Sequence, residues 1–444
     1  MFCMFYKVGH SDKNKEKAMF SRRSFLGGGA AIFAAGACGA AGSRTSLGEA
    51  QGGGASSSAT KEQHKKQGDF DDMYAGELDS AEWTPFSDRK VRVGIAGEGV
   101  CDFGSQFGYQ NHPNVEVVAV TDLDPKKCAL LQERTKAPKT YPSCEEMIKN
   151  AAADKLEAVY IATDAPSHAR LAIMALEHGL HVASAVPAVL GKEQLELVPK
   201  LIDAVKASGK VYHMNETTAF RESCYAMRKL YEAGEMGDIV YCEGEYFHCT
   251  DLKNGLGVGS YKGWRDCLPP LYYATHSTGY YTFTTHRRFT EVTCIGRPSA
   301  IPCYSAPNRY GNRFGSEFAF FKTEEGGSAR MLVAYDILAR NGERGRIYGT
   351  KGSFDDLTMS FLGDKTALAR VEWRKPKLPP GMPAGGHGGS HGYLTDDFIR
   401  AILLKDHRHC CDLKTSLDAT LAGIYAHISA EKGGETLKIP HVSA

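Results

Sequence analysis

A glycine-rich turn between two apolar runs is the feature that most constrains the fold of this chain. A β-branched run over 91–95 predicts a strand that ends at Gly97 and Gly99. A second apolar run over 115–120 predicts another strand, closed by Asp122 about 20 residues after the turn, as in a dinucleotide-binding βαβ unit. In such a unit the first glycine permits the turn, the second lets the backbone approach a pyrophosphate, and the acid binds a ribose diol. We therefore predict Gly97, Gly99 and Asp122 as cofactor-binding residues.

The motif departs from G-x-G-x-x-G at its third glycine, where Asp102 stands. We expect Gly104 to take over close packing, and the N-terminus of the helix after the turn to face the pyrophosphate. A glycine turn alone also occurs in plain βα loops, so the prediction depends on the strands and the acid. The residues beside Asp122 are Thr121, Leu123 and Asp124, and acids there would repel a 2′-phosphate. NAD is therefore predicted rather than NADP.

Composition excludes several classes of protein. The 444 residues carry 53 basic and 52 acidic side chains, so no bulk field attracts nucleic acid or an anionic membrane. The 13 cysteines include no C-x-x-C pair and no Cys/His spacing of the zinc type. We predict no nucleic-acid partner, no disulfide framework and no metal.

The N-terminal residues resemble a targeting signal. Residues 21–26 read SRRSFL, a twin-arginine motif, and an apolar segment rich in small residues follows, too short for a membrane span. The alternative is a chance arginine pair before an Ala/Gly-rich linker. We predict an export signal over 1–42, a periplasmic or cell-surface location, and Cys38 as a candidate lipid-anchor site. Residues 43–85 are rich in Ser, Gly, Gln, Lys and Asp and predict a disordered linker.

Strand-like and helix-like segments alternate from the glycine turn to residue 216. Buried runs at 156–162, 181–185 and 211–216 predict further strands, and helical patterns separate them. This alternation predicts an α/β Rossmann domain, a doubly wound parallel sheet with helices on both faces, over 86–216. The remaining residues, 217–444, are predicted to form a second, α+β domain that binds substrate and forms oligomers.

The segment 163–187, TDAPSHARLAIMALEHGLHVASAVP, resembles the glucose–fructose oxidoreductase/inositol dehydrogenase (Gfo/Idh/MocA) family. The resemblance implies that Thr163 and His168 lie at the cofactor, and that the second domain is a large open, mostly antiparallel sheet. It also implies a homo-oligomer. The family's Glu-Lys-Pro is replaced by Ala185, Val186 and Pro187, which removes the lysine that manages the substrate proton.

A polar and aromatic cluster follows in the predicted second domain. Tyr-x-Thr-His-x-x-Gly at 273–279 is similar to the motif of NAD-dependent α-N-acetylgalactosaminidases, a branch of that family. The resemblance implies Tyr273 and His276 as catalytic residues; a histidine can shuttle a proton near neutral pH. From residues alone, a hydrogen-bonded structural histidine is the competing interpretation.

The same branch implies further cleft residues. The predicted substrate-binding residues are Trp264, Arg265, Tyr246, His248 and His387, the last in the segment GGHGGSHGYLTDDFIRAI. Its H-x-x-x-H pair lies among glycines and lacks the helical geometry of a metal site. Two positions of the branch do not carry over: its glutamate aligns with Ala185 and its tyrosine with Phe220.

Three functions remain open from the sequence. The first is an exported oxidoreductase that transfers hydride from a sugar, glycoside or polyol to tightly bound NAD. The second is an NAD-dependent glycoside hydrolase that works by transient oxidation and elimination, which the lost glutamate and tyrosine disfavour. The third is a non-catalytic sugar-binding protein on a dehydrogenase fold, suggested by Val186 and the missing third glycine.

Overall fold

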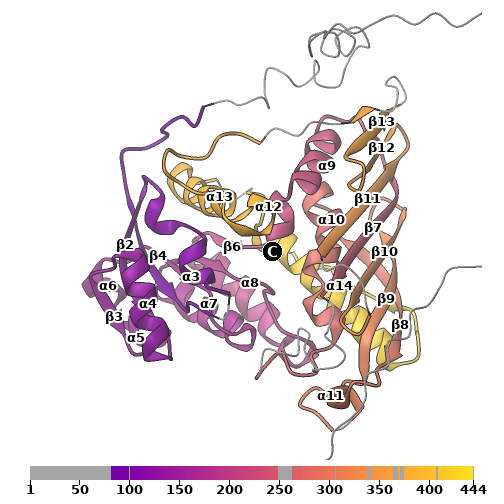
Figure 1. Cartoon of the computed structure of the whole chain (residues 1–444), viewed down its shortest axis with the longest axis horizontal. Helices are drawn as coiled ribbons and strands as arrows, with labels where there is room; N and C mark the ends of the chain where they lie inside the picture. The colour runs from indigo at the N-terminus through magenta and orange to yellow at the C-terminus, as the bar shows by residue number, and fades with distance from the viewer. Residues whose placement is uncertain are drawn as a thin grey trace, which may run out of the picture. The chain divides into compact units, whose positions relative to one another are not determined.

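A computed structural model describes most of the chain after residue 81 (Figure 1). The described ranges are 82–99, 101–248, 263–305, 307–337, 342–363, 369–370, 375–406 and 409–443. The predicted export signal, Cys38 and nearly all of the predicted linker lie outside them. Among the described helices, none has the length and apolar character needed to span a bilayer.

The first half of the described chain forms a six-stranded sheet in which every pair of neighbours is parallel. Its strands, in chain order, are β1 (Val91–Ala96), β2 (Val115–Thr121), β3 (Lys139–Tyr141), β4 (Ala158–Ile161), β5 (His181–Ser184) and β6 (Tyr212–Met214). The spatial order β3-β2-β1-β4-β5-β6 reverses direction at β1. The predicted doubly wound sheet is confirmed, and the carboxyl ends of β1 and β4 flank the crevice in which such folds bind ligands.

Helices connect these strands. They are α3 (Phe103–Gln106), α4 (Pro125–Thr135), α5 (Cys144–Lys149), α6 (Ala151–Asp154), α7 (His168–Glu177) and α8 (Leu197–Ser208), with short 3₁₀ turns η1 (Tyr109–Asn111), η2 (Ala165–Ser167) and η3 (Lys192–Gln194). Ser143 caps α5, its hydroxyl accepting from the Glu146 N–H at 3.2 Å. Helix α8 begins at Leu197, which places Pro199 in its first turn, where proline is tolerated.

The second half forms a nine-stranded sheet, antiparallel except where β7 and β10 pair. Its spatial order is β14-β13-β12-β11-β7-β10-β9-β8-β15. The strands are β7 (Ile239–Phe247), β8 (Phe289–Pro298), β9 (Phe314–Thr323), β10 (Ser328–Ala334), β11 (Gly342–Gly349), β12 (Gly352–Asp355), β13 (Ser360–Gly363), β14 (Ala369–Arg370) and β15 (Leu437–Lys438). The prediction of a large, mostly antiparallel sheet is confirmed.

Helices cover one face of this sheet, where Figure 1 shows α9, α10 and α14. The helices and turns of this half are η4 (Thr217–Phe220), α9 (Glu222–Glu232), η6 (Pro270–Tyr273), α10 (Thr275–Thr285), α11 (Pro302–Ser305), α12 (Gly386–Gly389), α13 (His391–Leu404) and α14 (Leu413–Glu431). All residues of α10 are buried. A Cβ at Gly244 on β7 would collide with the Ser277 carbonyl, and one at Gly345 on β11 with the Tyr280 ring. These two glycines therefore let α10 lie directly against the sheet.

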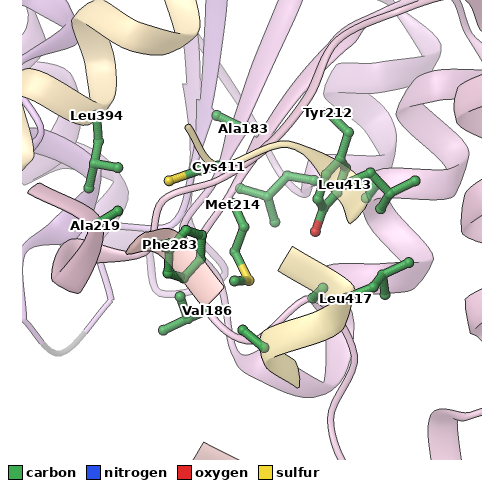
Figure 2. Packing of buried hydrophobic residues seen from close by; sticks show 14 of the residues in the cluster. Ala183, Val186, Tyr212, Met214, Ala219, Phe283, Leu394, Cys411, Leu413 and Leu417 are labelled. Carbon is green, nitrogen blue, oxygen red and sulfur yellow. The ribbon is translucent and has the colours of Figure 1, made fainter. Parts of the chain in front are cut away.

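A shared apolar core joins the parallel sheet to the later helices (Figure 2). Ala183 of β5 and Met214 of β6 lie in the same cluster as Phe283 of α10 and Leu417 of α14. The Met214 N–H also donates to the Cys411 carbonyl at 3.0 Å, which ties the segment before α14 to the sheet. The end of β6 is thereby fixed beside the helices of the second half.

A buried ion pair fixes the turn before α10. The Nδ1 of His427, on α14, lies 2.6 Å from the Glu317 Oε1 on β9, and the other oxygen of Glu317 accepts the Leu271 N–H of η6 at 2.7 Å. Burial alone would lower the pKa of His427, but the charge and hydrogen bond of Glu317 raise it to about 9. His427 is therefore charged in the folded protein at neutral pH.

We expect this pair to make stability fall at alkaline pH. Because the pKa of His427 rises from an unfolded value of about 6.5, its contribution is complete below that pH and is lost as pH rises through about 9; the full loss is about 3 kcal/mol. Urea unfolding at pH 6.5 and 10 should show wild type losing that much more free energy of unfolding than His427→Gln. An equal loss in both proteins would mean that His427 is neutral when folded.

Candidate functional site

A pocket of about 470 Å³ lies at the carboxyl ends of β1, β2 and β4. This volume falls within the ordinary range for cofactor and ligand sites. Four of the five predicted cofactor-binding residues line it, namely Gly97, Gly99, Asp122 and Thr163. The structure thus places the predicted nucleotide contacts around one cavity at the switch point of the sheet.

The glycines of the turn have distinct roles. Gly97 has φ +91°, and a Cβ there would lie 2.6 Å from the Ala162 carbonyl oxygen, so only glycine fits. At Gly99 an added Cβ would meet only that oxygen, at 3.5 Å, which leaves its backbone open to the pocket. A Cβ at Gly104 would collide with the Gly97 carbonyl. The prediction that Gly104 supplies the close packing is confirmed.

Asp122 is held in place by the backbone around it. Its Oδ2 accepts from the Glu98 N–H at 2.9 Å and its Oδ1 from the Asp124 N–H at 2.8 Å. A carboxylate has about four acceptor sites, so the remaining lone pairs are free for a ribose diol. This donor and acceptor chemistry fits the nucleoside half of NAD.

The helix after the turn differs from expectation. α3 spans only Phe103–Gln106, and Asp102 before it is left-handed, with φ 55°. The buried side chain of Glu98 occupies the start of this helix, accepting from the Ser105 N–H at 3.0 Å and from its hydroxyl at 2.6 Å. Arg134 compensates this carboxylate at 2.5 Å. The expected role of the helix N-terminus is therefore not supported, and backbone at the turn is left to face a pyrophosphate.

Two of the predicted residues lie elsewhere than expected. His168 is buried behind the pocket, its Nδ1 3.1 Å from the Pro187 carbonyl and its Nε2 3.2 Å from the Thr163 carbonyl. It joins the end of β4 to the turn at 185–187 and supports the pocket without lining it. Trp264, predicted to bind substrate, lines the cofactor pocket instead. Sequence reasoning also missed Lys127 and Arg170, two basic residues that line this pocket from α4 and α7.

A second, smaller pocket of about 70 Å³ gathers the other predicted residues. Tyr246, His248, Arg265, Tyr273, His276 and His387 all line it. Ala185 and Val186, which replace the family's Glu-Lys, line it as well. The fold therefore places at one site predicted residues that come from β7, η6, α10 and the loop before α13.

His276 belongs to a buried cluster of charges. Its Nδ1 lies 2.8 Å from the Glu216 Oε1 and 3.7 Å from the Glu343 Oε1. Arg221 neutralises Glu343 through two bonds, Nε to Oε2 at 2.6 Å and one terminal nitrogen to Oε1 at 2.8 Å. The Thr218 hydroxyl donates to the same carboxylate at 2.8 Å. Two carboxylates, one imidazole and one guanidinium thus share a site in which Glu216, Glu343 and His276 are buried and Arg221 is partly exposed.

This cluster sets the protonation of His276. Burial disfavours its charged form, but the charges of Glu216 and Glu343 outweigh burial and raise the pKa of the imidazole. Burial would likewise raise the pKa of Glu216, but the charge of His276 lowers it to about 2. A carboxylate held against one ring nitrogen of a histidine fixes the tautomer and leaves the other nitrogen free for proton transfer.

The partners of His276 differ in how far their sequence position points to a site. Glu216 lies two residues after β6, at the carboxyl edge where ligands bind, so its position was a usable signal. Glu343 is the second residue of β11 and Arg221 precedes α9, and nothing in their local pattern distinguishes them from surface charges.

The aromatic residues at the pocket are neutral donors. The Arg265 guanidinium lies 4.8 Å from the centre of the Tyr273 ring and donates to its hydroxyl at 3.3 Å. Burial is the main cause that raises the pKa of Tyr273, so its hydroxyl stays protonated. The Nδ1 of His248 is buried and has no hydrogen-bond partner among the described residues.

Among the described residues, one group could be considered for a metal. His213, Asp397 and His409 place their ligand atoms within 4.8 Å of one another. The two imidazole rings are stacked, with centres 4.9 Å apart and planes at 15°, so their in-plane lone pairs do not converge. Asp397 Oδ2 already lies 3.1 Å from the His213 Nε2 and accepts from the Cys410 N–H at 3.2 Å. This arrangement fits a hydrogen-bonded core cluster better than a tetrahedral site.

The parallel-sheet half of the chain is similar in sequence to a known family. The family model described as "Oxidoreductase family, NAD-binding Rossmann fold", Gfo/Idh/MocA, matches residues 91–216. Its description names NAD, so the predicted cofactor is confirmed.

Curated proteins that match part of this chain are named glycosyl hydrolases. A glycosyl hydrolase family 109 protein 1 of Bacteroides fragilis strain YCH46 is 32% identical over 164 residues, which is 36% of this chain and 35% of that protein. The chain therefore spans about a third of the length of the curated relatives it matches.

Solved structures share the whole fold. A scyllo-inositol dehydrogenase from Lactobacillus casei, with bound NAD(H) and scyllo-inositol, aligns with TM-score 0.61 at 16% identity over 79% of this chain and 99% of that one. A levoglucosan dehydrogenase with NADH and levoglucosan aligns with TM-score 0.63 at 18% identity over 80% and 100%. At these identities the likeness shows a shared fold.

We expect Asp122→Ala to weaken NAD binding about 10-fold to 100-fold, because a charged acceptor for the ribose is lost. Titration of cofactor-stripped protein with NADH, followed by fluorescence, measures the change. Asp122→Asn is the matched control, since it retains one acceptor oxygen. Its affinity for NADH should lie between those of wild type and Asp122→Ala. Unchanged affinity in Asp122→Ala would show that the nucleoside binds elsewhere.

Proposed function

We propose that this chain is an exported NAD-dependent oxidoreductase that acts on a sugar, glycoside or polyol through a tightly held nicotinamide. The observation that carries the proposal is the pair of His276 and Glu216, at 2.8 Å, in a pocket that also holds Val186. Val186 occupies the place of the family's proton-managing lysine. A histidine with a carboxylate partner replaces that function with a group suited to the same work.

The chain's own residues have separate tasks in this reaction. NAD, held by Gly97, Gly99, Asp122 and Thr163, would accept hydride from the substrate carbon. Glu216 holds the Nδ1 of His276, so the Nε2 of the neutral imidazole takes the hydroxyl proton of the substrate, and the charge that forms is stabilised by Glu216.

The remaining pocket residues hold and shield the substrate. Arg265 and the protonated hydroxyl of Tyr273 donate hydrogen bonds to substrate oxygens, and Tyr246 packs 4.8 Å from the His276 ring, excluding water. The two dehydrogenases of similar fold were solved with a polyol and an anhydrosugar, which supports this class of substrate.

The alternative is an NAD-dependent glycoside hydrolase, which the names of the curated relatives favour. Two positions oppose it. Ala185 lines the small pocket where that branch has a glutamate. Phe220, where it has a tyrosine, is buried and stacks on Tyr393 at 5.9 Å, outside the residues that line the pocket. Release of an aglycone without net reduction of NAD would decide for the hydrolase.

Export by the twin-arginine route is part of the proposal and rests on residues 21–26. Such export carries folded proteins, which suits a protein that leaves the cytoplasm with its cofactor bound. Fractionation of producing cells tests it: a protein that stays in the cytoplasm with residues 1–42 intact refutes this part.

We also propose a homo-oligomer formed through the open face of the nine-stranded sheet. Ile295 of β8 and Phe318 and Phe320 of β9 are exposed there, and Ile295 pairs with Phe318 in register. Adjacent exposed apolar residues on one sheet face favour burial against a second copy. Light scattering should give a multimer that Phe320→Glu weakens, with Leu404→Glu, on α13, as control. A monomeric wild type refutes it.

We expect His276→Gln to reduce kcat about 100-fold to 10,000-fold toward any sugar or polyol that wild type oxidises, because proton transfer is lost. The nucleotide released on denaturation should remain equimolar with protein, as in wild type. Loss of the nucleotide as well would mean that His276 is structural. Wild-type protein that neither contains nor binds NAD would refute the oxidoreductase and the hydrolase together.

Glu216→Gln tests the partner in the same assay. Since Glu216 raises the pKa of His276, its removal lowers that pKa, and the acid limb of the pH profile of kcat/KM should move to lower pH. Asp396→Asn, an acid on α13 that contacts His112 and Arg400, is the control and should leave the limb in place. A limb that does not move in Glu216→Gln assigns the titration to another group.

A further inference from the structure

The loop before α13 brings two histidines into contact. His387, Gly388 and Gly389 are all left-handed, with φ 52°, 70° and 76°, and this turn folds the chain back on itself. The Nδ1 of His387 then lies 3.0 Å from the Nε2 of His391. His387 lines the small pocket and is exposed, whereas His391 is fully buried.

Packing fixes the ring of His391. It stacks on Phe107 with centres 4.3 Å apart and planes at 16°, and the edge of Phe103 lies 5.6 Å away. The loop backbone passes directly over it: a Cβ at Gly385 would lie 2.7 Å from the His391 Cβ. The ring therefore has one orientation, which the neighbouring glycines make room for.

The hydrogen bonds around His391 decide which of its nitrogens carries the proton. The Gly386 N–H donates to the Nδ1 at 3.2 Å, so that nitrogen is an acceptor and bears no hydrogen. Burial, and then the neighbouring His387, lower the pKa of His391 to about 3 against a hydrogen bond to the Gln106 backbone that raises it, so the ring is neutral. Its single proton is on the Nε2, which lies 3.0 Å from the Nδ1 of His387 and donates to it.

The same reasoning carries over to His387. Its Nδ1 accepts, so its proton is on the Nε2, and charging the ring would require a second proton where His391 already donates. Burial and the charge of His276 also lower the pKa of His387. The bonds form one directional chain, from the Gly386 amide through His391 to His387.

We propose that His391 is a positioning residue that holds His387 in the Nε2–H tautomer, so that His387 is a fixed, neutral hydrogen-bond donor at the pocket. The inference rests on the proposed function for what the donor binds: an uncharged substrate oxygen, such as a hydroxyl or the carbonyl that forms on oxidation. A neutral imidazole can polarise such an oxygen without transferring a proton. The site would then hold two histidines with separate tasks, His276 for the proton and His387 for the oxygen.

Two variants of His391 separate the bond from the packing. His391→Phe keeps an aromatic ring against Phe107 and removes both hydrogen bonds. His391→Gln can accept from Gly386 with its amide oxygen and donate to His387 with its amide nitrogen. Neither His391 nor His387 is among the residues that we assign to proton transfer or to NAD binding.

The deciding measurement is ¹⁵N NMR of the imidazole nitrogens in the wild-type full chain. The His387 signals are assigned by their absence from His387→Gln, because the chain has 16 histidines. We expect the Nε2–H tautomer in wild type and His391→Gln, and a mixture of tautomers in His391→Phe. Catalytic efficiency, kcat/KM, should fall about 10-fold or more in His391→Phe and less than that in His391→Gln.

The spectra need no substrate, so failure of this inference is distinct from failure of the proposed function. An Nδ1–H tautomer in wild type overturns the inference, even if His391→Phe does not fold. A tautomer that stays unchanged in a folded His391→Phe overturns it too. An Nε2–H tautomer that depends on His391, in a protein that oxidises no sugar or polyol, supports the positioning and refutes the proposed function.

Discussion

The buried contact between His276 and Glu216 is the interaction on which the rest of the site depends. Glu216 stands at the end of the parallel sheet and His276 at the start of α10, so the pair joins the nucleotide-binding sheet to the helix that lies on the second sheet. Two buried charges of opposite sign gain little net stability, and either one alone is strongly destabilising. Such a pair is therefore understood more easily as a device for setting protonation than as a device for holding the fold.

The position of His276 in turn depends on two glycines of the second sheet, which have no side chains to hold α10 away. Gly244 and Gly345 remove the side chains that would hold α10 away from β7 and β11. On the other side, the bond from the Leu271 N–H to Glu317 and the charged His427 fix η6, which carries Tyr273 toward the pocket. Close packing from one side and a buried ion pair from the other place two side chains of one motif within a single pocket.

Much of this arrangement was predictable from sequence, for a physical reason. Alternating strand and helix periods report burial, so the parallel sheet was accessible, as were Gly97 and Asp122 at its switch point. Residues whose role depends on distant partners were not. Glu98 occupies the start of α3 only because Ser105 and Arg134 come back to it. Lys127 reaches the cofactor pocket from α4, so a reading of the neighbours of Asp122 alone missed it. Glu343 acquires meaning only where β11 lies beside His276.

Under the proposed function, Val186 at the place of the family's lysine gives a reason for the charges around His276. An ammonium group is charged at neutral pH without help, whereas a buried imidazole needs carboxylates nearby to stabilise the charge that it takes up with a proton. Glu216 supplies that field directly, and Glu343 adds to it while Arg221 limits the excess of negative charge. His387, held neutral by His391, adds a donor without adding a second positive charge beside His276. In this proposal the work of one lysine passes to a cluster whose members come from separate parts of the chain.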